Sequence, residues 1–87
     1  MYTAEIMLKN KAGLHARPAS LLVKTATSFN CNINIIKNVR KCNAKSIISV
    51  LSLEAIAGET LLIETDGEDG KEALKALVEL ANNNFGE

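Results

Sequence analysis

Few residues of this sequence could carry chemistry, and several of them lie in one stretch, GLHARPA at residues 13–19. The stretch contains the single histidine and the single proline of the chain, with Arg17 two residues after His15. An imidazole is a nucleophile when it is neutral, and an unperturbed histidine, with a pKa of about 6.5, is mostly neutral at physiological pH. His15 is therefore the candidate nucleophile.

The residues after His15 predict a helix that begins close to it. Pro18 suits the first turn of a helix because its φ is fixed and it has no backbone N–H. Apolar residues follow at helical spacing, so we expect a helix over residues 16–27. Unpaired N–H groups and the helix dipole attract anions to such an N-terminus. With Arg17 nearby, the stretch suits a histidine that accepts a phosphoryl group.

Length and composition limit the possible functions. Eighty-seven residues predict a single domain over residues 1–87. Ten basic and ten acidic residues give a formal charge of zero, which argues against direct binding of nucleic acid or an anionic membrane. No apolar run reaches the ~20 residues of a membrane span, and no targeting segment is recognisable, so we expect no membrane insertion and a cytoplasmic protein.

The cysteines and the histidine do not form a metal site. Cys31 and Cys42 lack the close spacing and the companion ligands of a zinc or redox motif. If the chain turns at Asn38-Val39, Cys42 faces Ile35 across a hairpin and not Cys31, which predicts two reduced thiols. We expect neither a metal nor another cofactor.

Alternating apolar and polar residues predict strands at 2–9, 31–37 and 60–65, with a short polar strand at 40–43. A turn at 67–70 then leads into a final helix. Asp69 and Glu72 have the spacing of a capping box at its start. Its buried stripe is expected to contain Leu74, Leu77, Val78 and Ala81.

The segment 46–53 is ambiguous from its pattern alone. Its β-branched residues favour a strand, whereas Ser46 is a good N-cap and Ile47, Val50 and Leu51 share a helical face. The other elements do not alternate strand and helix throughout. An α+β fold, in which helices pack on one face of an antiparallel sheet, is therefore expected.

Two motifs, GLHARPA at 13–19 and NAKSIISVLSL at 43–53, give the chain a resemblance to the histidine-containing phosphocarrier protein HPr of the bacterial phosphotransferase system. The resemblance covers essentially the whole chain. It implies an open-faced β-sandwich of order βαββαβα, with four antiparallel strands and three helices on one face. It also implies that the ambiguous segment is a short helix after Ser46.

The same resemblance implies roles for individual residues. His15 would accept a phosphoryl group on Nδ1 from Enzyme I and pass it to Enzyme II A domains, and Arg17 would hold the phosphate. Ser46 would match the serine modified by HPr kinase/phosphorylase, whose phosphorylated form binds the catabolite control protein in catabolite repression. Residues that would match the docking face for partners of a monomeric carrier are Ser20, Leu21, Lys24, Ile47, Ile48 and Leu51.

Other interpretations remain open at this point. The chain could be a regulatory module that acts mainly through Ser46, or a paralogue in a nitrogen-linked phosphorelay. No acid–base pair or metal cluster accompanies His15, so a carrier of phosphohistidine is expected and not an independent catalyst. Ser49 and Glu54 stand where glycine is common in the family. Ser49 could compete as a phosphate acceptor, and Glu54 with Ala55 could prolong the short helix.

Overall fold

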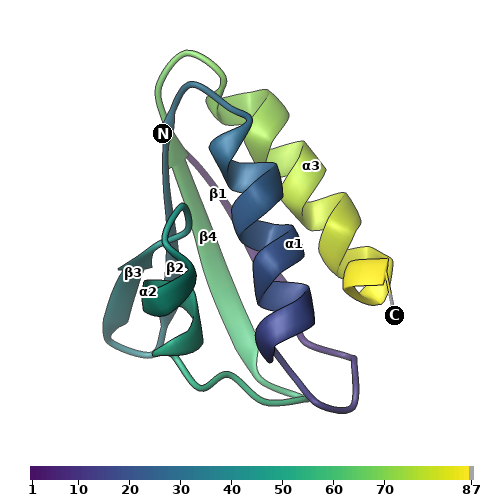
Figure 1. Cartoon of the computed structure of the whole chain (residues 1–87). Coiled ribbons are helices and arrows are strands. Elements are labelled where there is room, and N and C mark those ends of the chain that lie inside the picture. Colours follow the sequence, from purple (N-terminus) through teal and green to yellow (C-terminus); the bar gives the residue numbers. More distant parts are fainter. Residues whose placement is uncertain (87) are drawn as a thin grey trace.

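The computed structural model describes residues 1–86 and contains a four-stranded antiparallel sheet covered on one face by helices (Figure 1). The strands lie in the order β1-β4-β2-β3. The α+β prediction is therefore confirmed. In chain order the elements are β1 (Tyr2–Met7), α1 (Ala16–Thr27), β2 (Asn32–Lys37), β3 (Arg40–Asn43), α2 (Ile47–Leu51), β4 (Thr60–Asp66), α3 (Gly70–Asn82) and a 3-10 turn, η1 (Asn84–Gly86).

The core lies between the helix-covered face of the sheet and the helices. Ile63 of β4 is paired with Ala4 of β1 on one side and Ile35 of β2 on the other, and both isoleucines are fully buried. Leu22 of α1 and Leu77 of α3 are buried on the helix side of this core. Burying such side chains contributes about 1.5–3 kcal/mol each, so apolar alternation in the strands fixes which face the helices cover.

Helix α2 resolves the ambiguous segment in favour of a short helix. Ser46 is its N-cap: the Ser46 Oγ accepts a hydrogen bond from the Ser49 N–H at 3.4 Å, and the Ser46 carbonyl accepts from the Val50 N–H at 3.0 Å. Val50 is completely buried. Capping and burial of one face thus outweigh the strand preference of the β-branched residues.

Two local predictions are wrong. Glu54 does not prolong α2, because its φ of 51° takes the chain out of the helix after Leu51. Asp69 is the N-cap residue of α3, but its side chain makes no capping hydrogen bond. Asp69 Oδ2 instead accepts the Asn30 N–H at 2.7 Å, which ties the start of α3 to the turn after α1. A distant donor therefore outcompetes the local capping box.

The cysteines are free, as their positions predicted. Cys42 is paired with Ile35 across the β2–β3 hairpin, whose turn at Asn38 has a φ of 56°. Burial raises the pKa of both thiols, so they remain protonated at neutral pH. Among the helices described, none is both long and apolar enough to cross a membrane.

Candidate functional site

His15 is the N-cap residue of α1, as the sequence predicted. Its backbone is extended, with φ −85° and ψ −168°, and its side chain is half-buried and does not cap the helix. The first amide that donates within the helix is that of Ala19, which bonds the His15 carbonyl at 2.9 Å. The N–H groups of Ala16 and Arg17 therefore have no acceptor inside the helix, and Pro18 has no N–H. An anion beside His15 would meet two amide donors and the positive end of the helix dipole.

The loop that carries His15 is fixed to the segment after α2. Leu14 N–H donates to the Ala55 carbonyl at 2.9 Å, and within the loop Gly13 N–H donates to the Asn10 carbonyl at 2.9 Å. The amide nitrogen of Asn10 donates back to the Gly13 carbonyl at 2.6 Å. Gly13 has a φ of 68°, and a Cβ atom there would lie 2.5 Å from Ala55 O and 2.7 Å from Ile56 Cα. Only glycine fits this approach of two backbones.

Residues 53–59, which support the loop, are themselves held by an ionic network. Lys37 Nζ donates to the carbonyls of Leu53 and Glu54 at 2.9 and 3.2 Å and lies 3.2 Å from Glu59 Oε1. Glu59 Oε1 also accepts the Ile56 N–H at 2.7 Å. The Ile56 hydrogen bond, helped by Lys37, lowers the pKa of the Glu59 carboxyl. A charge pair near the end of β2 thus fixes the segment on which the histidine loop rests.

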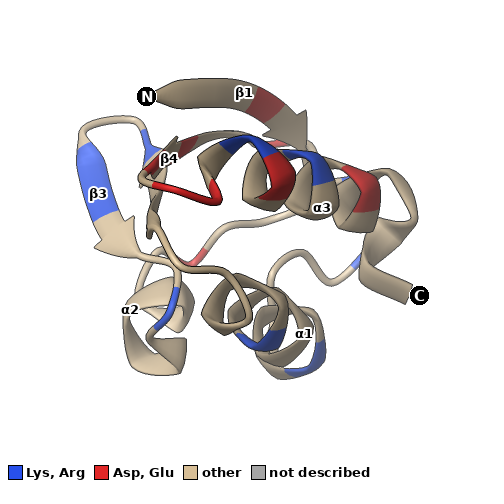
Figure 2. Ribbon diagram, turned by 90° about the horizontal axis from the view of Figure 1, so that it is seen from above, with Lys and Arg blue, Asp and Glu red and all other residues tan. Residues whose placement is uncertain are grey.

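Arg17 is exposed in the first turn of α1, where the helix dipole disfavours a cation by about 0.3–1 kcal/mol. The charged residues of α1 are Arg17 and Lys24, both basic, and α2 has none. Figure 2 shows basic residues on α1 and no acidic residue on either α1 or α2, whereas α3 carries both kinds. A protein that docks over α1 and α2 would therefore need an acidic surface.

The predicted docking residues differ in exposure. Ser20 and Lys24 are exposed on α1, and Leu21 is half-buried beside Gly86 of the C-terminal turn. On α2, Ile48 is 79% exposed and Leu51 38% exposed. Ile47 instead packs partly against the core. The packing of α1 against α2 places the exposed members on neighbouring helices. Apolar side chains exposed in this way are typical of a docking surface.

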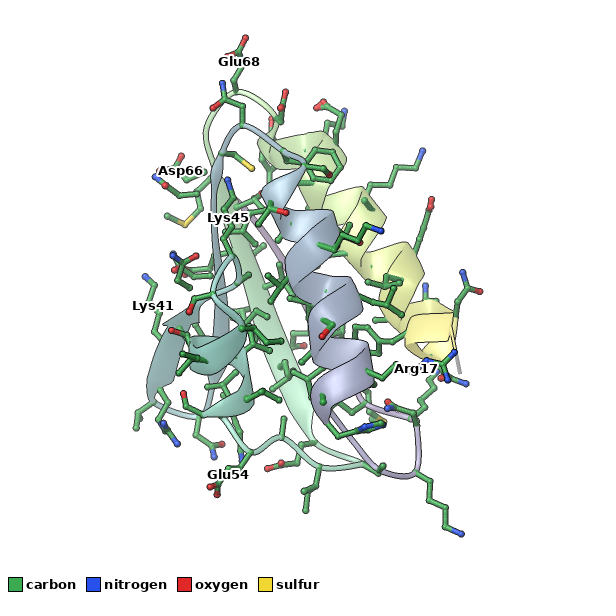
Figure 3. The ribbon with its side chains drawn as sticks, in the orientation of Figure 1. Arg17, Lys41, Lys45, Glu54, Asp66 and Glu68 are labelled. Atoms are coloured by element: carbon green, nitrogen blue, oxygen red, sulfur yellow. The ribbon has the colours of Figure 1, made fainter. Side chains whose placement is uncertain are left out.

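Ser46 lies at the opposite end of α2 from Leu51. It is half-buried, and its Oγ is engaged as the helix cap. Its neighbour Lys45 donates from Nζ to the Phe29 carbonyl just after α1, at 2.8 Å. In Figure 3, Lys45 and Arg17 lie toward different ends of α1. The two candidate phosphate positions are therefore separate sites, one at each of two helix starts.

Sequence reasoning missed the contribution of residues 53–59. Ala55 supplies only a backbone carbonyl, so its side-chain type gave no signal. Ile56, 63% exposed, adds an apolar side chain next to the His15 loop. Lys37 and Glu59 are far apart in sequence and read as ordinary surface charges. A glycine at position 13 could have indicated a close approach of the backbone to another segment. It does not reveal which segment that is.

The comparisons with known proteins agree with this geometry. The family model described as "PTS HPr component phosphorylation site" matches residues 2–83. Phosphocarrier protein HPr of Neisseria meningitidis is 40% identical over 87 residues, which cover all of this chain and 98% of that protein. The HPr-like protein Crh of Halalkalibacterium halodurans is 42% identical over 78 residues, 90% of this chain and 93% of that protein.

Solved structures give the same result. A crystal structure of HPr from Thermoanaerobacter tengcongensis superposes with a TM-score of 0.97 at 46% identity and covers 100% of this chain and 98% of that chain. HPr from the same bacterium was also solved as a dimer, with a TM-score of 0.81 and full coverage of both chains. The family model and the solved structures define the class of this protein as HPr-type phosphocarriers. The chain belongs to the HPr family.

Gly13→Ala should destabilise the fold more than Gly58→Ala. Both glycines have positive φ, 68° and 91°, so each alanine is strained by about 1–2 kcal/mol. A Cβ on Gly58 meets nothing within 4 Å, whereas one on Gly13 meets the 55–56 backbone. The overpacking adds about 1–3 kcal/mol at Gly13 only. Urea titrations measure the free energies of unfolding, and equal values for Gly13→Ala and Gly58→Ala would contradict this account of the loop.

Replacing Glu59 should change how stability depends on pH. Because the pKa of Glu59 is lowered on folding, its stabilisation is fully present above the ordinary value of 4.5 and is lost as pH falls through the lower folded-state pKa. The difference in unfolding free energy between wild type and Glu59→Gln should therefore shrink from about pH 6 to about pH 3. Urea titrations across this range measure it, and a difference that stayed constant would contradict the assignment.

Proposed function

We propose that this protein is a cytoplasmic phosphocarrier of the phosphoenolpyruvate-dependent sugar phosphotransferase system. His15 accepts a phosphoryl group from phosphorylated Enzyme I and passes it to Enzyme II A domains. The observation that carries the proposal is the half-buried imidazole at the start of α1, followed by two amides without helical acceptors and an exposed arginine. Membership of the HPr family supports it.

The transfer is a displacement at phosphorus. The lone pair of His15 Nδ1 forms the N–P bond while the bond between phosphorus and the donor group breaks, and that electron pair leaves with the donor. In this proposal the N–H groups of Ala16 and Arg17 and the Arg17 guanidinium bind the phosphoryl oxygens. Because His15 is only half-buried and Arg17 is exposed, the group stays accessible to the next acceptor. This suits a carrier whose phosphoryl group must leave again.

Incubation with ³²P-labelled phosphoenolpyruvate and Enzyme I should place one acid-labile phosphate on His15. His15→Ala should abolish the label. Arg17→Ala should slow transfer by about tenfold, less than the ~100-fold loss for a buried donor, because this side chain is exposed. Lys75→Ala, which removes the same charge from the outer surface of α3, is the matched control and should transfer at the wild-type rate. Labelling of His15→Ala at the wild-type level would overturn the proposal.

We further propose that Ser46 is a regulatory site for HPr kinase/phosphorylase, whose product could bind a catabolite control protein. A phosphate at Ser46 would add about −1.5 to −2 charges at the start of α2, where the helix tolerates an anion. The apolar docking residues of the same helix would then lie next to a strong negative charge. Phosphorylation would thereby alter which proteins dock.

A regulatory module that acts mainly through Ser46 is the second candidate function. The similarity to the HPr-like protein Crh favours it. The presence of His15 favours the carrier, since the resemblance implies that repression proteins of this type lack the histidine. A paralogue in a nitrogen-linked phosphorelay is a third candidate. The residues around Ser46 resemble those of the sugar branch and favour the carrier over this paralogue. If the phosphohistidine form restores sugar uptake, the protein is the carrier and neither the regulatory module nor the nitrogen-linked paralogue.

Incubation with ATP and HPr kinase/phosphorylase should give an acid-stable phosphate that Ser46→Ala abolishes and Ser49→Ala retains. Ser46→Ala should also lower the free energy of unfolding by about 0.5 kcal/mol, the low end for a lost cap because the Oγ to Ser49 N distance is 3.4 Å. Phosphopeptide mapping identifies the residue. A phosphate on Ser49 in the wild type would move the regulatory site three residues along.

A further inference from the structure

Glu54 lies at the margin of the surface around His15. It is exposed, it follows α2, and the next residue, Ala55, supplies the carbonyl that holds the histidine loop. Figure 3 shows Glu54 below α2 and Arg17 near the lower end of α1, on the side of the C-terminal turn. Glu54 thus adds an acidic side chain next to helices α1 and α2, which carry no acidic residue.

The backbone of Glu54 is held in a conformation that suits glycine. Its φ is 51°, in the left-handed region that is unfavourable for a residue with a Cβ. The N–H of Glu54 donates to the Leu51 carbonyl at 3.1 Å, and its own carbonyl accepts from Lys37 Nζ at 3.2 Å. Both backbone groups are therefore fixed, and the strain cannot relax by a local rotation.

The side chain of Glu54 does not help to hold this conformation. Within residues 1–86 the Glu54 carboxylate forms no hydrogen bond or ion pair. It also lies next to the carbonyl end of α2, where the helix dipole disfavours an anion. Of the other three non-glycine residues with positive φ, Asn38 and Asn84 belong to a type that tolerates it, and Phe85 is buried. At Glu54 the backbone bonds to Leu51 and Lys37 hold the conformation, and within residues 1–86 the side chain adds no hydrogen bond or ion pair.

We propose that Glu54 determines partner specificity, by pairing its carboxylate with a basic side chain of the protein that docks over His15. This rests on the proposed carrier function. The neighbouring side chains Ile48, Leu51 and Ile56 are exposed and apolar, so a partner that covers them also removes water from the carboxylate. A dehydrated carboxylate without a cation opposes binding strongly.

The partner surface that fits is therefore acidic opposite Arg17 and Lys24, with a basic side chain opposite Glu54. A partner adapted to a carrier with glycine at this position has no reason to hold that cation. It would have to bury the carboxylate unpaired, so Glu54 selects against it as well as for the matched partner. The partner that carries this basic side chain is the Enzyme I that phosphorylates His15.

Initial rates of labelling from phosphoenolpyruvate by that Enzyme I test the proposal. Glu54→Gln keeps the size and the strained backbone but removes the charge, and it should raise KM for the carrier about tenfold with kcat nearly unchanged. Glu54→Lys should raise KM further. Glu79→Gln, which removes the same charge from α3, is the matched control and should leave KM unchanged. Tm values for Glu54→Gln and wild type should agree, which excludes unfolding as the cause.

Values of KM for Glu54→Gln and Glu54→Lys within twofold of wild type would overturn the inference while leaving the carrier function intact. Absence of labelling in wild type and all variants would overturn the carrier function and this inference with it. With an Enzyme I whose own HPr has glycine at this position, Glu54→Gly should lower KM relative to wild type. A higher KM for Glu54→Gly with that enzyme would also count against the proposal.

Discussion

The site depends on one contact between two backbones, the hydrogen bond from Leu14 N–H to Ala55 O. It fixes the direction from which the chain enters α1, and therefore where the imidazole of His15 stands relative to the helix start. Gly13 makes the contact possible, because a Cβ at that residue would lie too close to the backbone of Ala55 and Ile56. The Lys37–Glu59 pair then holds the 53–59 segment in place from the sheet side.

Electrostatics divide the molecule into surfaces with different uses. Helix α1 carries only basic charges, α2 carries no charge, and α3 carries charges of both signs (Figure 2). The chain has no net charge, so it is not drawn to anionic surfaces in general. A local basic face can still attract an acidic protein surface at short range, and screening by salt limits it to that range. The basic face can therefore bind an acidic protein surface, while the protein as a whole does not bind polyanions nonspecifically.

Patterns that are local in sequence predicted most of the fold. Pro18 and the spacing after it predicted α1 with both of its ends, and alternation predicted the four strands, because each depends on residues a few positions apart. The position of His15 at the helix start followed from the same pattern. The short helix α2 needed the family resemblance, since cap and β-branched content pointed in opposite directions. Asp69 failed as a local cap because its partner, Asn30, is 39 residues away.

The main-chain character of the Leu14–Ala55 contact separates two kinds of evolutionary change. The exposed side chains of Glu54 and Ile56 can be replaced without moving the carbonyl that positions the histidine, provided that the backbone path is kept. Partner preference can therefore drift or be redesigned while the reactive centre stays the same. A library randomised at positions 54 and 56, with Gly13 kept, is thus a rational starting point for orthogonal phosphorelay pairs.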